Sequence, residues 1–539
     1  MNRLRLGVGS NGKGRSIMPD WKTIETLAEI PQFHAHRAPE RTALVFGGRR
    51  TTFAELERRC ADAAAALSAE GVRPGDRVAW LDLNSDRTYE MLFACARSGA
   101  VFCPLNWRLS VSEISAILED ADAQILFVGE RFYDIAAKLA LPDLRKIVAI
   151  DGVSRGWEPY SDWRVRRGAD AAASAGAPGD PAIQIYTSGT TGRPKGVVLS
   201  NSALLATGKE SNGEMAWNDW SENDVSLLTM PCFHIAGLRW GVMGLAPGAT
   251  TVIMPEFSPE GVVDMVAAHR VTRLFLAPTA IRLVLQAAEK RDADFSSLKL
   301  IWYGASPISP DLLKEAMRVF GCQFVQTYGM TETGAQATFL PPADHDPCGN
   351  ERMRSAGKAL PGVEIQIVDK KGEALPDGVA GEICIKSPSN MLGYWRREDE
   401  TRAVLRDGWM RTGDAGYMDA DGYVFIQDRI KDMIVTGGEN VYSTEVENAV
   451  AAHPAVVETA VIGVPDEKWG EAVKAIVVLR PGAEASADEI IAYVKSRIAS
   501  YKAPKSVDFV DVLPKNPAGK TQKNKLREKY WTGRDRTIG

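Results

Sequence analysis

The stretch Ile185–Gly196 has the sequence IYTSGTTGRPKG and continues a predicted buried strand, Ala182–Tyr186. In α/β proteins, ligands bind at loops that leave the carboxyl ends of strands. Glycines allow close approach of the backbone, hydroxyls donate to anionic oxygens, and Lys195 adds a compact cation. The glycines are Gly189 and Gly192, and the hydroxyls are those of Thr187, Ser188, Thr190 and Thr191. This combination predicts a phosphate-binding loop.

The loop is not a Walker A motif. From Gly189 the sequence runs G-T-T-G-R-P-K-G, so the G-K-[ST] order that ends the Walker motif is absent. Pro194 has no backbone N–H, which argues against a continuous cradle of amides. The alternative is an ordinary solvated turn. The ordered series of glycines, hydroxyls and a lysine argues against it.

Predicted strands and helices alternate on both sides of the loop, which favours βαβ units with mostly parallel sheets. On the N-terminal side the expected helices are Phe53–Glu70 and Tyr89–Ser98, and the expected strands are Arg77–Asp82 and Gln124–Val128. On the C-terminal side further strands begin at Thr251, Arg273 and Leu298. Small residues at Asp170–Asp180 form a linker before the loop.

After Pro361 the pattern changes to short strands separated by Asp-Gly turns, which predicts a β-rich subdomain. These strands are Glu364–Val368, Gly381–Lys386 and Tyr423–Gln427. A small α+β module follows, in which Ser443 and Thr444 are expected to cap the first helix. Its helices are Ser443–Ala452 and Asp488–Ile498, and its strands are Val456–Val464, Ala472–Leu479 and Lys505–Val510.

The predicted fold class is therefore α/β. We expect a large N-terminal domain of two mixed α/β sheet subdomains plus a β-rich subdomain, followed by a small α+β C-terminal domain. Residues 1–20 are expected to form a disordered extension, residues 21–429 the N-terminal domain and residues 430–539 the C-terminal domain. The segment Met1–Met18 lacks the apolar core of a secretory signal, and a targeting tail is the alternative to an extension.

The bulk composition excludes several classes of protein. The chain has 539 residues, 45% of them hydrophobic, which is typical of an ordinary globular protein. A formal net charge of −5 argues against a nucleic-acid binder. Seven scattered cysteines without a C-x-x-C pair are typical of reduced thiols in a cytoplasmic protein. No apolar run is long enough to predict a membrane-spanning helix.

Three further segments carry residues suited to nucleotide chemistry. Gln326–Gly334 (QTYGMTETG) places the carboxylate of Glu332 among hydroxyls after a buried strand. Alone, Glu332 is an ordinary loop glutamate, but beside a phosphate loop a single carboxylate can serve Mg²⁺. The other two segments are Gly408–Gly416 (GWMRTGDAG), followed by Asp428–Tyr442 (DRIKDMIVTGGENVY), and Pro514–Lys523 (PKNPAGKTQK).

These motifs, in this order, resemble those of the adenylate-forming superfamily, which contains acyl-CoA synthetases, peptide-synthetase adenylation domains and luciferases. The resemblance covers essentially the whole chain after Ile24. It implies catalytic roles for Lys520, Lys195, Glu332 and Thr187. It also implies that Thr187, Thr191 and Glu332 lie at a Mg²⁺ site.

The same resemblance implies a nucleotide site. Tyr303–Pro307 (YGASP) matches the segment whose backbone lines adenine, and the ring of Tyr328 would cover the other face of the base. Asp414 would hold the ribose hydroxyls, and Arg429 would contact ribose or phosphate. The implied nucleotide-binding residues also include the loop from Thr187 to Gly192, Lys195, Gly304, Ala305, Ser306, Gln326, Thr327, Gly329, Met330, Thr331 and Glu332.

The resemblance further implies a mobile C-terminal domain. Lys431 occupies the family's hinge position, and Gly437 and Gly438 would let the pantetheine arm of coenzyme A pass close to the backbone. Lys520 would stabilise negative charge during adenylation and then withdraw. On composition alone, the lysine-rich segment around Lys520 is an ordinary solvated surface.

The acid pocket is expected near Pro231–Gly237 (PCFHIAG), which matches the family's gate segment. His234 could contact the acid or be a core histidine. Trp240 would shorten a straight pocket if it points inward, which favours a medium-chain, branched or aromatic acid; if it points outward, that inference falls. The expected substrate-binding residues are Phe233, His234, Gly237, Trp240, Tyr303, Gly329, Met330 and Ala335.

The function predicted on these grounds is an AMP-forming acyl-CoA ligase that uses ATP, Mg²⁺ and coenzyme A. A carboxylate attacks ATP to give an acyl-adenylate and pyrophosphate, and the coenzyme A thiol then displaces AMP. The substrate is expected to be a medium- or long-chain fatty, branched or aromatic acid, and family members are often homodimers. The main alternative is a stand-alone ligase that loads a separate carrier protein.

Three further functions have less support. Luciferase-like oxidation is compatible with the scaffold, since fold does not fix function. A nucleotide sensor that has lost its chemistry would show damage at the five positions Lys195, Glu332, Asp414, Arg429 and Lys520, yet all are present. A metal hydrolase would need a cluster of ligands, and no spacing of that kind occurs.

Overall fold

The computed structural model describes residues 20–139, 144–152, 156–165, 176–187, 194–209, 215–436, 439–515 and 520–532. The chain divides into two compact units. The first holds the described residues up to Met353, with Gly357–Glu364 and Lys386–Met410. The second holds Arg354–Ala356, Ile365–Ile385 and the described residues from Arg411 onward.

Two large sheets form the first unit. Within the described residues, the first sheet has eight strands in the order β19-β9-β8-β4-β3-β5-β6-β7. Their bounds are β3 Arg77–Leu81, β4 Val101–Pro104, β5 Ile125–Val128, β6 Lys146–Ala149, β7 Glu158–Pro159, β8 Pro181–Thr187, β9 Lys195–Ser200 and β19 Gly393–Tyr394. The central strands β4, β3, β5 and β6 are parallel, whereas β8 and β9 form an antiparallel pair.

The second sheet has nine strands among the residues described, in the order β16-β15-β14-β13-β12-β10-β11-β1-β2. Their bounds are β1 Thr42–Phe46, β2 Arg49–Thr52, β10 Val225–Leu228, β11 Thr250–Ile253, β12 Arg273–Leu276, β13 Leu300–Gly304, β14 Gln323–Tyr328, β15 Thr338–Leu340 and β16 Lys358–Ala359. Strands β12, β13 and β14 are parallel, so their carboxyl ends lie together.

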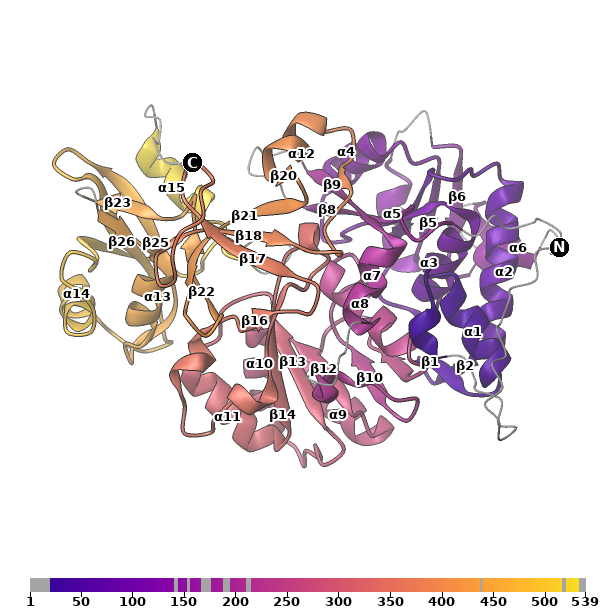
Figure 1. Ribbon diagram of the computed structural model, residues 1–539, viewed down its shortest axis with the longest axis horizontal. Coiled ribbons are helices and arrows are strands. Elements are labelled where there is room, and N and C mark those ends of the chain that lie inside the picture. The colour runs from indigo at the N-terminus through magenta and orange to yellow at the C-terminus, as the bar shows by residue number, and fades with distance from the viewer. Residues whose placement is uncertain are drawn as a thin grey trace. The chain divides into compact units, whose positions relative to one another are not determined.

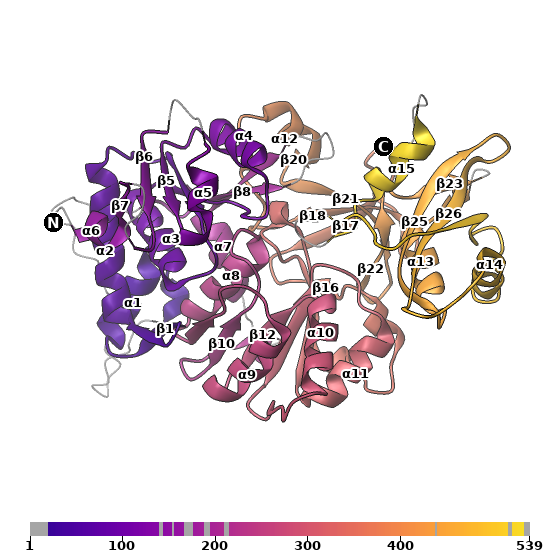
Figure 2. The ribbon, with the colours of Figure 1, turned by 180° about the vertical axis from the view of Figure 1, so that it is seen from behind.

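The helices of the first unit pack in layers against these sheets (Figure 1). Their bounds are α1 Glu29–Arg37, α2 Phe53–Ala69, α3 Asp86–Ser98, α4 Val111–Ala121, α5 Tyr133–Ala136, α6 Tyr160–Val165, α7 Asn201–Lys209, α8 Ile235–Leu245, α9 Pro259–His269, α10 Pro278–Ala288, α11 Pro310–Phe320 and α12 Glu398–Val404. The core that contains α1, α2, α3, α7 and α8 takes side chains from both sheets. Helices α9, α10 and α11 cover the other face of the nine-stranded sheet, and α4 and α5 cover the other face of the eight-stranded sheet (Figure 2).

Local sequence signals explain where these helices begin and end. Helix α11 follows Ser309, whose side chain accepts from the Leu312 N–H, and it starts with a proline. It ends at Gly321, which has a φ of 62°. The chain then enters β14, which leads directly to the Glu332 segment, so the caps of α11 help to set where that segment lies.

The second unit contains a β-rich part and an α+β module. In the β-rich part β18 pairs with β17 and β21, and β22 also pairs with β21. The bounds are β17 Glu364–Val368, β18 Gly381–Lys386, β21 Trp409–Met418 and β22 Val424–Arg429. In the first unit, the short strand β20 (Leu405–Arg406) pairs with the first two residues of β21.

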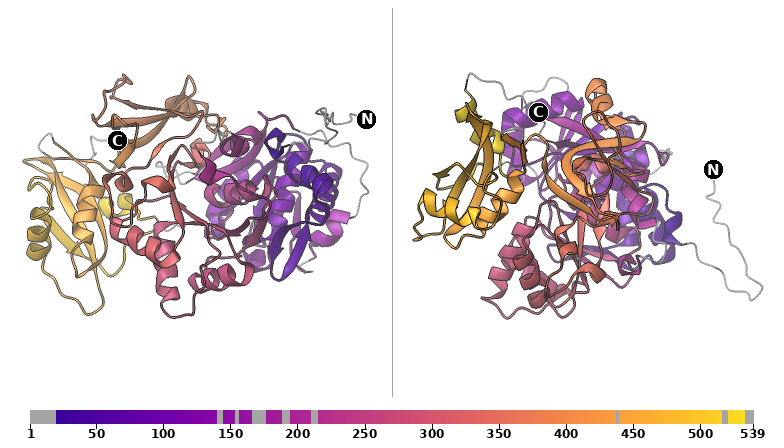
Figure 3. Two further views of the ribbon diagram at one scale, coloured as in Figure 1. Left: turned by 60° about the horizontal axis from the view of Figure 1, so that its bottom comes forward. Right: turned by 60° about the vertical axis from the view of Figure 1, so that its left-hand side comes forward.

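The α+β module forms around a long hairpin, β25 with β26 (Figure 3, gold to yellow). The strand bounds are β23 Ile434–Thr436, β24 Glu439–Val441, β25 Val456–Asp466, β26 Gly470–Leu479 and β27 Ser506–Phe509, and the helices are α13 Ser443–Ala451, α14 Ala487–Lys495 and α15 Lys523–Trp531. Helices α13 and α14 cover one face of the hairpin, and α15 covers the other. The mixed α/β fold class is thereby confirmed, together with nearly every strand and helix that the sequence predicts.

The predicted cap of α13 is wrong. Tyr442, not Ser443, is the N-cap residue, and its side chain makes no capping bond. The backbone N–H of Ser443 donates instead to the carboxylate of Asp428, a residue of β22. The Ser443 hydroxyl oxygen accepts a hydrogen bond of 2.5 Å from the Lys523 ammonium. The Asp428 carboxylate therefore caps the start of α13, where the local sequence pattern predicted the Ser443 side chain.

The predicted boundary at residue 430 stays a prediction, since the two compact units follow a different division of the chain. The predicted extension lies outside the described residues, except for Asp20. Among the helices that the structure describes, none has the length and apolar character to cross a membrane.

Candidate active site

The root of the phosphate loop is an antiparallel pair of strands. Thr187 at the end of β8 lies directly opposite Lys195 at the start of β9. A Cβ on Gly196 would come within 2.7 Å of the Gln184 amide nitrogen, so a side chain there would crowd the hairpin. Five predicted loop residues lie outside the described residues: Ser188, Gly189, Thr190, Thr191 and Gly192.

Lys195 is held by two side chains from a segment far along the chain. Its ammonium contacts the Glu400 carboxylate on α12. It also lies 5.0 Å from the centroid of the Tyr394 ring, within the range of a cation–π contact. The predicted phosphate cation therefore stands beside the segment formed by β19 and α12.

Glu332 is buried, with an exposed fraction of 7%, in the short helix Thr331–Thr333. Its Oε1 accepts a hydrogen bond of 2.9 Å from the Tyr394 hydroxyl. Burial, followed by the Glu332 charge, raises the pKa of Tyr394, so this hydroxyl stays protonated and acts as a donor. Oε2 of Glu332 makes no hydrogen bond to any residue in the described part of the chain, which leaves one oxygen open.

This arrangement fits Mg²⁺ better than a metal held by protein ligands alone. Within the described ranges, no cluster of three or more His, Cys, Asp or Glu side chains could hold a metal. Mg²⁺ characteristically takes one or two carboxylates and completes its shell with phosphate and water. The short helix that carries Glu332 packs beside β9, whose first residue is opposite Thr187. One open carboxylate oxygen and one nearby hydroxyl make a suitable donor set.

The predicted adenine segment lies where two parallel strands end. Gly304 of β13 is paired with Thr327 of β14, and a Cβ on Gly304 would come within 2.3 Å of the Thr327 carbonyl oxygen. Ala305 has a φ of 68°, a strained conformation for a residue other than glycine. The geometry brings Gly304, Ala305 and Ser306 next to Thr327 and Tyr328, at the edge where α/β folds bind ligands.

A second close approach occurs after β14. A Cβ on Gly329 would meet the Ala335 carbonyl oxygen at 2.4 Å. Ala335 itself has a φ of 79°. The turn from Gly329 through Met330 and Thr331 thus folds back on itself, and this turn is what presents Glu332.

Tyr303 belongs to a hydrogen-bonded chain that the sequence did not reveal. Its hydroxyl lies 2.9 Å from Nε2 of His345 and 3.3 Å from Oε1 of Gln326. The other ring nitrogen of His345 lies 2.9 Å from the Pro341 carbonyl oxygen, so Nδ1 carries the proton. Burial lowers the pKa of His345 to about 4, which keeps the ring neutral. The side chain of Tyr303 is fully buried.

The expected gate segment begins α8. His234 is the N-cap residue of this helix, and its ring lies 4.5 Å from that of Phe233. Phe233 packs edge-on against Trp107 at 5.8 Å. A Cβ on Gly237 would meet the Pro231 carbonyl oxygen at 2.3 Å, which explains a glycine in the first turn.

Trp240 lies in an aromatic cluster on α8. Its indole N–H donates to the Leu227 carbonyl oxygen at 3.0 Å, and its exposed fraction is 2%. Its ring lies 5.2 Å from Trp220, 5.6 Å from Trp302 and 5.9 Å from Phe275. These contacts fix the rotamer that the sequence left open.

The second unit pairs two of the predicted nucleotide residues with each other. Asp414 on β21 is opposite Arg429 on β22, and Arg429 Nε lies 2.7 Å from Asp414 Oδ1. Asp414 is nearly fully buried and its backbone N–H donates to Thr412 Oγ1 at 3.0 Å. Lys431 lies in the turn after β22, and the side chain of Lys520 is exposed. Gly437 and Gly438 lie outside the described residues.

Sequence reasoning missed Tyr394, Glu400 and His345. Each contacts a predicted site residue that is distant in the sequence: Glu332, Lys195 and Tyr303 respectively. No local pattern marks them, since each lies far along the chain from the residue that it contacts. The pairing of β19 with β9 brings Tyr394 to the site.

Comparisons with known proteins identify the family of this chain. The chain belongs to the AMP-binding enzyme family, whose model matches residues 32–395. The family's C-terminal domain matches residues 445–520.

Among individual proteins, the chain is 41% identical to the fatty acid–[acyl-carrier-protein] ligase ScoC of Streptomyces coeruleorubidus, over 94% of this chain and 97% of that protein. It is 38% identical to a feruloyl-CoA synthase of Amycolatopsis sp, over 94% of this chain and 99% of the relative. ATP-bound MatB from Rhodopseudomonas palustris is similar in structure, with a TM-score of 0.85 and 33% identity over 94% of this chain and 99% of the MatB chain.

Proposed function

We propose that this protein is an AMP-forming acid–thiol ligase that joins a carboxylic acid to coenzyme A. The observation that carries the proposal is the placement of Thr187, Lys195 and Glu332 around one strand pair, at a loop suited to phosphate. Membership of the AMP-binding enzyme family supports nucleotide binding. Relatives named as CoA ligases, such as the feruloyl-CoA synthase, support the acyl transfer.

In the first half-reaction, an oxygen of the acid attacks the α-phosphorus of ATP and pyrophosphate leaves. Negative charge gathers on the phosphoryl oxygens, so the enzyme contributes mainly positioning and electrostatic stabilisation. Lys195 and the Thr187 hydroxyl are proposed to bind phosphate, with Lys520 adding a second cation. The product is a mixed anhydride with a good leaving group, which divides one difficult step into two.

Glu332, with its open oxygen, and Thr187 are proposed to hold Mg²⁺, with Thr191 as a further donor. When bound, Mg²⁺ neutralises phosphate charge and orients the oxygens that change partners. Tyr394 keeps the Glu332 carboxylate in one orientation through its hydrogen bond. This chain would therefore supply an oriented carboxylate and hydroxyl oxygens, and phosphate and water would complete the shell.

In the second half-reaction the thiol of coenzyme A attacks the acyl carbon and AMP leaves. We propose that a rotation at Lys431 withdraws Lys520 and that the backbone at Gly437 and Gly438 passes the pantetheine arm. The ion pair of Asp414 with Arg429 would then hold an acceptor for ribose hydroxyls next to a cation for phosphate.

The acid is proposed to be a medium- or long-chain fatty, branched or aromatic acid. The pocket would be lined by Phe233, His234, Gly237, Trp240, Tyr303, Gly329, Met330 and Ala335. If the Trp240 ring faces the acid, the limit that it sets on the pocket length would be rigid, because its indole N–H is held by the Leu227 carbonyl. A cytoplasmic location and a homodimer stay predictions.

A second candidate is a ligase that transfers the acyl group to a carrier protein instead of coenzyme A. The similarity to ScoC, named as a fatty acid–[acyl-carrier-protein] ligase, specifically favours it. Both candidates share the acyl-adenylate and differ only in the thiol that accepts the acyl group.

The shared first step is tested by acid-dependent exchange of labelled pyrophosphate into ATP, in the absence of any thiol. We expect exchange with wild type and at least a hundredfold loss in Lys195→Ala, since removal of one group that stabilises transition-state charge typically costs about 10²–10³-fold in rate. Absence of exchange with every acid of a panel that spans short, long and aromatic chains would refute adenylation.

A further inference from the structure

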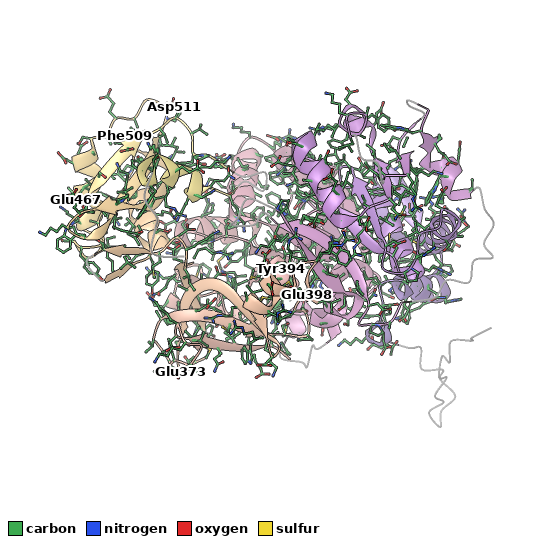
Figure 4. All side chains as sticks on the ribbon, turned by 90° about the horizontal axis from the view of Figure 1, so that it is seen from above. Glu373, Tyr394, Glu398, Glu467, Phe509 and Asp511 are labelled. Atoms are coloured by element: carbon green, nitrogen blue, oxygen red, sulfur yellow. The ribbon has the colours of Figure 1, made fainter. Side chains whose placement is uncertain are left out.

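The segment that contacts both charged residues of the phosphate site is formed by β19 and α12, residues 393–404. Its strand, β19, pairs with β9, and Tyr394 is opposite Val197. The backbone N–H of Trp395 also donates to the Gly196 carbonyl oxygen at 2.7 Å. Figure 4 labels Tyr394 and Glu398, which mark the strand and the first turn of the helix. We call residues 393–404 the β19–α12 segment.

Glu400 on this segment has two cationic partners. Its Oε2 contacts the Lys195 ammonium, and its Oε1 lies 3.8 Å from Arg397 Nε. Arg397 is in turn held by Asp120, with 2.6 Å between Nη2 and Oδ1. If Lys195 leaves, Glu400 therefore keeps a neighbouring positive charge. The Glu400 carboxylate is therefore not left without a counter-charge when Lys195 moves away.

The ammonium of Lys195 has three N–H donors, and a donor held by Glu400 is not available to a phosphate. A nucleotide presents several anionic oxygens to the same ammonium, which a single carboxylate at a half-exposed position does not match. Lys195 therefore has two alternative partners, one in the protein and one in the ligand. The Tyr394 backbone is held in place, because β19 pairs with β9, and its ring lies 5.0 Å from the ammonium when Glu400 is the partner.

We propose that Glu400 is a positioning residue that holds Lys195 in the nucleotide-free enzyme and releases it to phosphate when ATP binds. The proposal rests on the proposed function, because it needs a nucleotide at the Lys195 loop. It goes beyond that function by assigning a resting partner to the phosphate lysine. The ion pair orders Lys195 before binding and competes with the ligand for it.

Competition predicts a gain of affinity when the carboxylate charge is removed. About 38% of the Glu400 side chain is exposed, and ion pairs at exposed positions are worth little. Breaking a pair of this kind before binding corresponds to about a two- to fivefold weakening of affinity. Glu400→Gln should therefore bind MgATP about two- to fivefold more tightly than wild type.

Helix α12 supplies a matched control. Glu398 is on the same helix, is exposed, and pairs only weakly with Arg402, at 3.5 Å. Glu398→Gln removes the same charge from the same helix without touching Lys195. We expect this variant to bind MgATP as wild type does, which separates the specific contact from a change of net charge.

The test is the dissociation constant of MgATP by titration calorimetry, without acid or thiol, for wild type, Glu400→Gln and Glu398→Gln. Repeating it at high salt adds a second readout, since screening should reduce the advantage of Glu400→Gln. Equal or weaker binding by Glu400→Gln overturns the proposal, as does an equal gain in Glu398→Gln. Failure of wild type itself to bind MgATP would instead count against the proposed function.

Discussion

Removal of the Tyr394 hydroxyl should lower the affinity of the site for Mg²⁺ and leave the aromatic ring beside Lys195 in place. Tyr394→Phe deletes one hydrogen bond of 2.9 Å to the buried Glu332 carboxylate. A bond to a charged group is worth about 1.5–3 kcal/mol, and loss of a partner that orients a metal ligand typically costs about 10–100-fold in affinity. Because Tyr394 is partly exposed, we expect the low end of this range, about tenfold.

The assay is acid-dependent pyrophosphate exchange as a function of Mg²⁺ concentration at saturating ATP. The concentration of Mg²⁺ for half-maximal rate should rise about tenfold in Tyr394→Phe. Tyr493→Phe removes a hydroxyl that donates to the Ala452 carbonyl oxygen and serves as the control. An unchanged Mg²⁺ dependence in Tyr394→Phe would refute the idea that this hydroxyl orients Glu332.

Three further outcomes are expected. Lys520→Ala should lose at least a hundredfold in adenylation but keep thioester formation from a supplied acyl-adenylate, measured in separate half-reaction assays; equal losses in both would show that Lys520 serves both steps. The pKa of His345 is lowered by burial to about 4 from an ordinary 6.5, so the unfolded state takes up a proton first and stability falls as pH drops from 6.5 to 4, by about 3 kcal/mol in total. His345→Gln should flatten this part of the pH dependence of chemical unfolding, and an unchanged slope would assign the effect to other groups. Trp240→Ala should lower the free energy of unfolding by about 3–5 kcal/mol, because it empties a packed aromatic cluster; a change below about 1 kcal/mol would contradict that packing.

Much of the fold could be predicted because its signals are local. Buried parallel strands appear as short apolar runs, and β3 and β5 coincide with the predicted strands to within one residue at either end. The phosphate loop and the Glu332 segment stay predictions as binding sites; they rest on chemistry that is encoded in consecutive residues, and Ser188–Gly192 lie outside the described residues. The cap of α13 could not be predicted, since Asp428 comes to it from another strand.

The contacts that orient the site depend on tertiary structure. Glu332 and Tyr394 are brought together by the pairing of β19 with β9. The ion pair of Asp414 with Arg429 depends on the register of β21 and β22, and a shift of one residue would turn one side chain to the opposite face. A sequence specifies such pairings only through the whole fold, so single-motif reasoning finds the chemical groups but not the side chains that hold them.

The central claim is that the protein joins an acid to coenzyme A through an acyl-adenylate. The most direct measurement is release of AMP from ATP, with and without coenzyme A, across short, medium, long and aromatic acids. We predict sustained AMP release only when both an acid and coenzyme A are present, with a thioester as the second product. Acid-dependent pyrophosphate release without turnover of coenzyme A would contradict the claim and identify a carrier protein as the acceptor.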